Sequence, residues 1–167
     1  MKLNRFGIIT IVFILLIAVI LLVITVLVPE NTNPAFASAI DFVNAAGTGD
    51  DTRAMTHLSP ELQTYVAENC PDGRISACVE SYSPEEWGAF RSVVFRRAIP
   101  DGDRAWDVDL IGTYESGVGA SGVCVYNRVE QAEDGEWYVT AWAGFVHCAE
   151  AASRNMATNP ETPNRAP

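Results

Sequence analysis

The feature that most constrains this chain is an uninterrupted apolar run from Phe6 to Val28, which contains no charged residue. At 1.5 Å per residue such a run forms a helix of roughly 35 Å, slightly more than the hydrocarbon core of a bilayer at about 30 Å. Lys2 and Arg5 precede the run, and positive charge favours the cytoplasmic side. We therefore expect a cytoplasmic N-terminus (1–5), a single-pass transmembrane signal-anchor helix (6–28) in the cell membrane, and an extracytoplasmic remainder.

A cleaved signal peptide is the alternative interpretation of the same run. Ala35-Phe36-Ala37 has the small-x-small form that signal peptidases accept, with cleavage after Ala37. The run is longer than the roughly 7 to 15 residues of a typical signal peptide core, and a polar stretch separates it from Ala37. The uncleaved anchor is our expectation, and Ser38 as the first residue of the mature protein would contradict it.

The charges are divided unequally along the chain. All 21 acidic residues and nine arginines follow the apolar run, so the part beyond it carries −12, while Lys2 and Arg5 precede it. An acidic surface without lysine disfavours contact with nucleic acid or anionic lipid and is typical of a soluble extracytoplasmic domain. We expect no nucleic-acid partner and no cofactor.

The four cysteines are Cys70, Cys78, Cys124 and Cys148. An even number in an extracytoplasmic part fits two disulfides, and no Cys-x-x-Cys pair indicates a metal site. Cys70 and Cys78 close a short loop through Pro-Asp-Gly, which leaves Cys124 for Cys148. A hairpin with a three-residue loop would place position 124 opposite 144, four residues short of Cys148, so pairing of Cys148 with Cys70 or Cys78 stays open.

Cap signals and apolar periodicity predict a helical first half and a β-rich second half. The expected helices begin at Asn33-Pro34, Asp51, Ser59-Pro60 and Ser83-Pro84, and the expected strands cover 93–99, 104–115, 123–131 and 136–146. We expect an α+β roll, with helices packed on a curved antiparallel sheet of four or more strands. The linker is expected at 29–33, the domain at 34–148 and a disordered tail at 149–167, because the tail is rich in proline and asparagine.

The order of these elements resembles the nuclear transport factor 2-like, or cystatin-like α+β roll, superfamily, especially its bacterial membrane-anchored members of unknown function. The resemblance rests on "FASAIDFVNAAGTGDDTRAMTHLSPEL" in the helical part and on "EDGEWYVTAWAGFV" in the last hairpin. It implies the fold, but the superfamily contains isomerases, dehydratases, cyclases and non-catalytic binding modules, so it does not choose a function.

Superfamily enzymes such as ketosteroid isomerases use a carboxylate base and a tyrosine that stabilises the oxyanion. Residues of these types are Asp41, Tyr65, Asp107, Asp109, Tyr114, Tyr126 and Tyr138. The aspartates are expected on solvated faces, and His57 and His147 are isolated, so we assign no catalytic residue. Our pocket candidates are Tyr65, Trp106, Tyr114 and Trp142.

Two further patterns concern ligands and partners. Gly117 to Gly122 matches Gly-x-Gly-x-x-Gly, but a strand is predicted after it, where a dinucleotide site needs a helix. Strict alternation puts Tyr138 and Trp142 on one face of the last strand and Trp137, Val139 and Phe145 on the other. Both faces would then be apolar, which favours a protein partner or homodimer on the aromatic face.

The sequence therefore predicts a membrane-anchored, extracytoplasmic binding or scaffold module without catalysis. The alternatives are a proton-transfer enzyme of the isomerase, dehydratase or cyclase type and a structural subunit of an envelope or secretion complex. The enzyme needs a buried carboxylate together with a tyrosine or histidine inside the roll.

Overall fold

The structure of this chain is a computed structural model, which describes residues 14, 17, 33–117 and 122–167. The expected cytoplasmic end, most of the apolar run and the expected linker up to residue 32 lie outside these residues. No helix in the described part of the chain is long and apolar enough to cross a membrane. Residues Asn33–Pro167 form a compact unit, to which the description below refers.

The first half of this unit is helical, as the cap signals predicted. Its elements are α2 (Pro34–Gly47), α3 (Asp51–Thr56), α4 (Pro60–Asn69), the 3-10 turn η1 (Pro71–Gly73), α5 (Ile75–Tyr82) and the 3-10 turn η2 (Glu85–Trp87). The Asn33 side chain accepts a hydrogen bond from Ala35 N at 3.0 Å, and Ser59 Oγ accepts one from Leu62 N at 3.3 Å. Both are N-caps, which satisfy backbone donors that the first turn leaves free.

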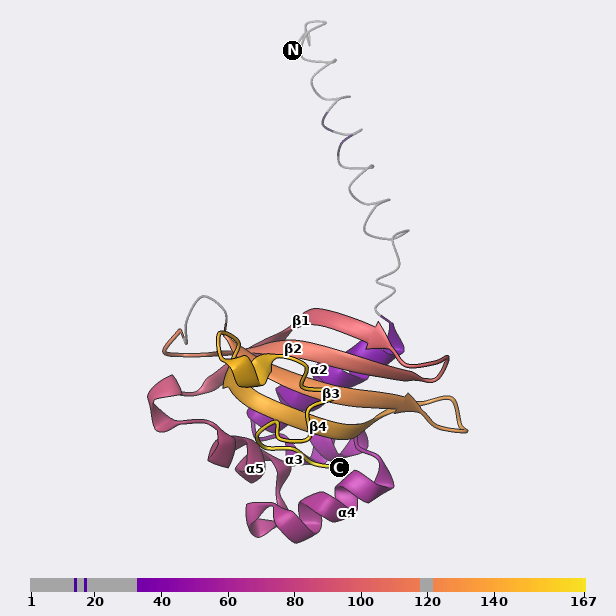
Figure 1. The fold of residues 1–167 in the computed structure, drawn as a ribbon, viewed down its shortest axis with the longest axis horizontal. Coiled ribbons are helices and arrows are strands. Elements are labelled where there is room, and N and C mark those ends of the chain that lie inside the picture. Colours follow the sequence, from indigo (N-terminus) through magenta and orange to yellow (C-terminus); the bar gives the residue numbers. More distant parts are fainter. Residues whose placement is uncertain (1–13, 15–16, 18–32, 118–121) are drawn as a thin grey trace, which may run out of the picture. The chain divides into compact units, whose positions relative to one another are not determined.

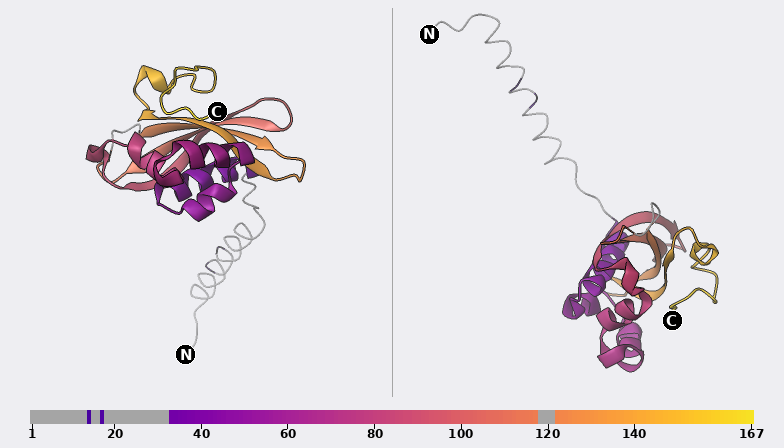
Figure 2. Two further views of the ribbon diagram at one scale, coloured as in Figure 1. Left: turned by 90° about the horizontal axis from the view of Figure 1, so that it is seen from below. Right: turned by 90° about the vertical axis from the view of Figure 1, so that its left-hand side faces the viewer.

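The second half is one antiparallel sheet in the strand order β1-β2-β3-β4. Its strands are β1 (Phe90–Pro100), β2 (Ala105–Tyr114), β3 (Val123–Gln131) and β4 (Trp137–His147). The helices cover one face of this sheet, and the C-terminal segment lies against the other (Figures 1 and 2). The structure thus confirms an α+β fold with a four-stranded antiparallel sheet.

Two bulges in β4 explain how the second disulfide forms. Near the hairpin the register is the predicted one, with Glu130 opposite Tyr138, but it shifts by one residue after Val139 and by another after Gly144. Cys124 therefore lies opposite Val146 rather than opposite residue 144. Cys124 pairs with Cys148 and Cys70 with Cys78, each with its Cα atoms 5.0 Å apart.

The same bulges correct the predicted faces of β4. Trp142 is buried on the helix side, where its ring lies 5.8 Å from that of Phe42. Val139 and Phe145 belong to the same core, so Trp142 shares their face instead of opposing them. A bulge adds one residue to one strand and reverses the alternation beyond it, which is why strict alternation misplaced Trp142. The partner or homodimer stays a prediction, but Trp142 does not contribute to an outer aromatic face.

The segment after Cys148 also differs from the prediction, because it packs where disorder was expected. Met156 is 1% exposed beside Tyr126 and Ala143 on the outer face of the sheet. Gly144 N donates to Pro163 O at 2.8 Å, and Ala166 N donates to Trp142 O at 2.9 Å, so the segment pairs along the edge of β4. The buried Met156 and the hydrogen bonds to β4 hold the segment in place, although its composition is polar.

One helix was not predicted, and one predicted helix is a single turn. The α5 helix begins after Arg74 without a side-chain cap, and therefore carries no start signal. The predicted helix from Ser83-Pro84 is the 3-10 turn η2, because β1 already begins at Phe90.

Candidate functional site

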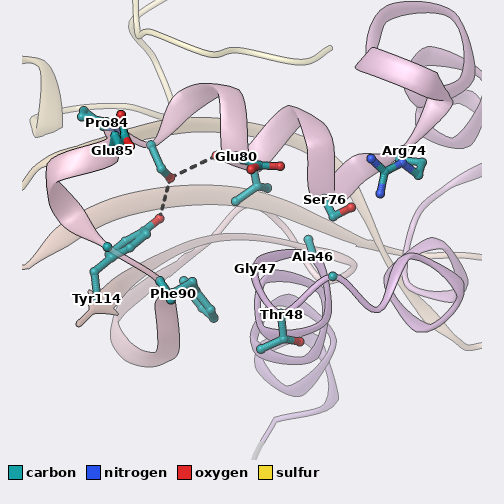
Figure 3. Close-up of a pocket in the computed structure, with 15 residues that line it drawn as sticks. Ala46, Gly47, Thr48, Arg74, Ser76, Glu80, Pro84, Glu85, Phe90 and Tyr114 are labelled. Carbon is teal, nitrogen blue, oxygen red and sulfur yellow. Dashed lines mark hydrogen bonds between the residues drawn. The ribbon is translucent and has the colours of Figure 1, made fainter. Parts of the chain in front are cut away.

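A groove of about 880 Å³ lies beside α5, between the C-terminal end of α2 and the segment that leads into β1 (Figure 3). We call it the α5 groove. Its lining residues are Ala46, Gly47, Thr48, Gly49, Arg74, Ser76, Val79, Glu80, Ser83, Pro84, Glu85, Gly88, Ala89, Phe90 and Tyr114. The volume lies in the range of small-molecule sites.

Two glycines allow the walls of the α5 groove to approach one another. A Cβ atom on Gly47 would lie 2.5 Å from the ring of Phe90, so only glycine lets the end of α2 meet the start of β1. Gly88 has a φ of +70°, which turns the chain from η2 into β1 and which other residues adopt only with strain. At the other end, the Cys70–Cys78 disulfide fastens α5 to the end of α4.

Tyr114, one of the predicted pocket residues, lies in this groove, and its hydroxyl donates a hydrogen bond to Ser83. Ser83 Oγ lies 3.0 Å from the Val79 carbonyl oxygen and 2.9 Å from the Tyr114 hydroxyl oxygen. Since the carbonyl only accepts, both contacts are hydrogen bonds only if Ser83 donates to Val79 and Tyr114 donates to Ser83. Burial raises the pKa of Tyr114.

The charged residues lie at different places along the groove. Arg74 is at the start of α5 and approaches Asp51 at 3.9 Å and Asp72 at 3.8 Å. Glu80 and Glu85 lie toward the other end, are exposed, and take part in none of the ion pairs among the described residues. Figure 3 shows Arg74 at one side, Tyr114 and Glu85 at the other and Glu80 between them.

A second polar cluster lies inside the roll, between sheet and helices. Asn127 is fully buried, and neither atom of its amide has a hydrogen-bond partner in the described structure. Trp142 stands opposite it on β4, and its Nε1 also lacks a partner. Burial raises the pKa of the nearby Tyr82.

The four predicted pocket residues do not form one site. Tyr65 and Trp142 meet in the interior, with ring centroids 5.7 Å apart, while Tyr114 lies in the α5 groove. Trp106 lies elsewhere, 5.1 Å from the ring of Phe36. The structure therefore distributes these residues over the groove, the interior and the start of α2.

The two aspartates of β2 that were named by residue type lie away from the α5 groove and from the interior cluster around Asn127. Asp109 is 5% exposed on the outer face of the sheet and is paired with Arg97 at 2.6 Å. Asp107 accepts from the Tyr126 hydroxyl at 2.7 Å, next to an Arg128 that is also paired with Asp101 and Glu130. The predicted face was right, but these groups form an ion-pair network instead of a simple solvated surface. Burial, together with the hydrogen bond to Asp107, raises the pKa of Tyr126.

The remaining candidates are peripheral. Asp41 pairs with Arg53 on the surface at 3.1 Å, and the Tyr138 hydroxyl lies 3.4 Å from Asp134. His147 lies edge-on to Trp87, with ring centroids 5.3 Å apart, and burial lowers the pKa of His57. Among the described residues no group of three or more side chains could hold a metal ion.

The structure describes only the two ends of the glycine-rich match, Gly117 and Gly122, and neither lines the α5 groove. Positions 118–121 lie outside the described residues, and β3 begins at Val123, directly after Gly122. A strand therefore follows the motif, as predicted, where a dinucleotide site needs a helix N-terminus.

No sequence pattern indicated Ser83, Glu80 and Glu85 as site residues, because the groove depends on α5, which carries no start signal. The sequence analysis also missed Asn127, which did carry a signal. Asn127 continues the inward-facing series of Val123, Val125 and Val129, and a polar residue in such a series stands out.

Fold and groove together define a small, disulfide-bonded α+β domain with a surface site of mixed polarity. The chain matches no family model, no curated protein and no solved structure.

Proposed function

We propose that this chain is a membrane-anchored, extracytoplasmic binding module of the nuclear transport factor 2-like type, which takes a ligand in the α5 groove without transforming it. The single observation that carries the proposal is the groove itself, with about 880 Å³ bounded by a mixture of apolar and polar side chains. The two disulfides support an oxidising compartment, and the apolar run before residue 29 supports the anchor.

The polar groups of the groove favour binding over proton transfer. Tyr114 donates its hydroxyl hydrogen bond to Ser83, so the hydroxyl is not available to stabilise an oxyanion. Glu80 and Glu85 are exposed, whereas a general base that works near neutral pH has its pKa raised by burial. The buried carboxylate, Asp109, is on the outer face and neutralised by Arg97.

The proposal is tested by filling the groove. Thr48→Trp and Ala89→Trp each add an indole at an exposed lining position, and Thr64→Trp adds one on α4 away from the groove. A mixed library of cationic, neutral and anionic fragments is screened on the full-length chain by saturation-transfer NMR. Near-ultraviolet circular dichroism checks that each variant folds.

We expect fragments that bind the wild type and Thr64→Trp but neither groove variant. Binding that survives in both groove variants would contradict the proposal, as would a library without binders. If affinity capture from detergent extracts gave a stable protein complex that both groove variants keep, the structural-subunit alternative would replace it.

A further inference from the structure

We propose that the ligand of the α5 groove carries a cationic group, a primary ammonium or a guanidinium, bound at the end formed by Glu80, Glu85 and Tyr114. This inference rests on the proposed function of the groove and adds the chemical class of its ligand.

The first argument comes from the two helices that end at the groove. Ala46, Gly47 and Thr48 at the C-terminal end of α2 line it, and so does Ser83 at the C-terminal end of α5. A helix C-terminus carries a partial negative charge and leaves backbone carbonyls without intrahelical donors. Neither helix has a basic residue in its last turn to balance that charge. The C-terminal end of α5 therefore favours a cation beside Glu80 and Glu85. The end of α2 contributes less, because its last carbonyls accept hydrogen bonds from the N–H groups of Thr48, Gly49 and Asp50 and it lies beside Ser76 (Figure 3).

The second argument is the distribution of full charges. Glu80 and Glu85 are exposed without an ion-pair partner among the described residues, while the charge of Arg74 is matched by Asp51 and Asp72. At 1.5 Å per residue along α5, Arg74 lies roughly 9 Å from Glu80. The guanidinium of Arg74 is thus distant from the acidic end, and the domain around it carries a large negative charge that attracts cations.

The third argument is the hydrogen-bonding state of Tyr114. Because the Tyr114 hydroxyl donates its hydrogen bond to Ser83, the phenol oxygen can only accept a hydrogen bond from a ligand. It can accept from an N–H group and cannot donate to a carboxylate or phosphate. The rings of Phe90 and Tyr114 lie edge-to-face, with centroids 5.5 Å apart, and aromatic faces also attract cations.

The apolar part of the groove fits the stem of such a ligand. Val79, Phe90 and Tyr114 line the groove together, and of these three Phe90 leaves the largest part of its side chain exposed. A methylene chain can lie on these side chains while its charged end meets the glutamates, as lysine and arginine stems do in proteins.

The test uses three probes that share a five-carbon chain and differ in charge: pentylammonium, 1-pentanol and pentanoate. Their affinities for the full-length chain are measured by NMR titration at low and at physiological salt. The test variants are Glu80→Gln and Glu85→Gln, alone and combined. Glu86→Gln is the matched control, since Glu86 is exposed in the same turn as Glu85 but does not line the groove.

We expect pentylammonium to bind more tightly than pentanoate, and the double variant to weaken it about tenfold without changing 1-pentanol. Glu86→Gln should leave all three affinities unchanged, and added salt should weaken only the cation. Pentanoate binding as tightly as pentylammonium, or an unchanged cation affinity in the double variant, would overturn the inference. If 1-pentanol still bound in the groove, the binding function would stand while the cation class failed. If no probe bound there, both would fail.

Discussion

Replacement of Asn127 by leucine should make the protein more stable, because this amide is buried without partners. Asn127 has no exposed surface, and both its Nδ2 and Oδ1 lack hydrogen bonds among the described residues. Burying an amide without hydrogen bonds costs about 1–3 kcal/mol, and replacement by leucine removes this cost. Because leucine is of similar size, the packing penalty should stay below about 1.5 kcal/mol. We expect a net gain of about 1–2 kcal/mol in the free energy of unfolding.

The measurement is guanidinium unfolding of the full-length chain with both disulfides intact. Trp142, which lies opposite Asn127, gives a fluorescence signal from the same place. Asn44→Leu is the matched control, because Asn44 Oδ1 accepts from Val93 N at 2.9 Å. Its loss leaves that N–H unpaired and should cost about 1–3 kcal/mol. The same substitution is therefore expected to have opposite signs at the two sites.

A loss of more than about 1 kcal/mol in Asn127→Leu would refute this reasoning. It would mean that the amide is hydrogen-bonded inside the roll, through internal water or a bound molecule, and that the interior cluster is a polar site. Natural proteins keep unpaired buried groups mostly where function requires them. The sign of the change in unfolding free energy therefore decides whether the Asn127 amide is unpaired and destabilising or belongs to a polar binding site.

Three further predictions test the groove wall, the C-terminal segment and the pH response. Gly47→Ala puts a Cβ 2.5 Å from the Phe90 ring and should cost about 1–3 kcal/mol, whereas the Cβ of Gly112→Ala meets no atom closer than 3.6 Å, at a position without a positive φ, and should cost less; thermal unfolding compares the two. Met156→Ala removes a side chain that is 1% exposed and should lower the unfolding free energy by about 2–5 kcal/mol, with no loss if the segment does not pack in solution. Burial lowers the pKa of His57 in the folded state, so the unfolded state binds its proton more readily. Stability should be retained above pH 6.5 and decline as the pH falls below it, and His57→Gln should flatten that part of the stability profile, as followed by urea unfolding at several pH values.

Local signals predicted those parts of the fold that depend on neighbouring residues. Asn33 and Ser59 cap the helices that follow them, because a cap is a contact over two or three residues. The hairpin between β3 and β4 was found for the same reason, and its register near Gln131 and Trp137 is the predicted one.

The rest depends on contacts that no local pattern encodes. The bulges of β4 move Trp142 to the helix side and bring Cys148 to Cys124, yet the alternation of residue types continues through them. The α5 helix has Arg74 at its N-cap without a side-chain hydrogen bond, and it is held instead by a disulfide and by packing. The C-terminal segment packs through the buried side chains of Met156 and Ala166 and through hydrogen bonds to the edge of β4, none of which composition alone can place.

Because local patterns do not encode such contacts, the candidate site could not be predicted from the sequence, although several of its residues had been interpreted as helix boundaries. Gly47 ends α2, as a glycine-rich stretch after an apolar helix indicates, whereas Ser83 was interpreted as the start of a helix and in the structure follows the end of α5. Because α2 and α5 both end at residues that line the groove, these two helix ends form part of its wall, where Glu80 and Glu85 have no ion-pair partner among the described residues. Only the tertiary fold brings two such ends together. A motif search therefore misses a site of this kind, since its chemistry comes from helix ends and not from a set of residues at fixed spacing.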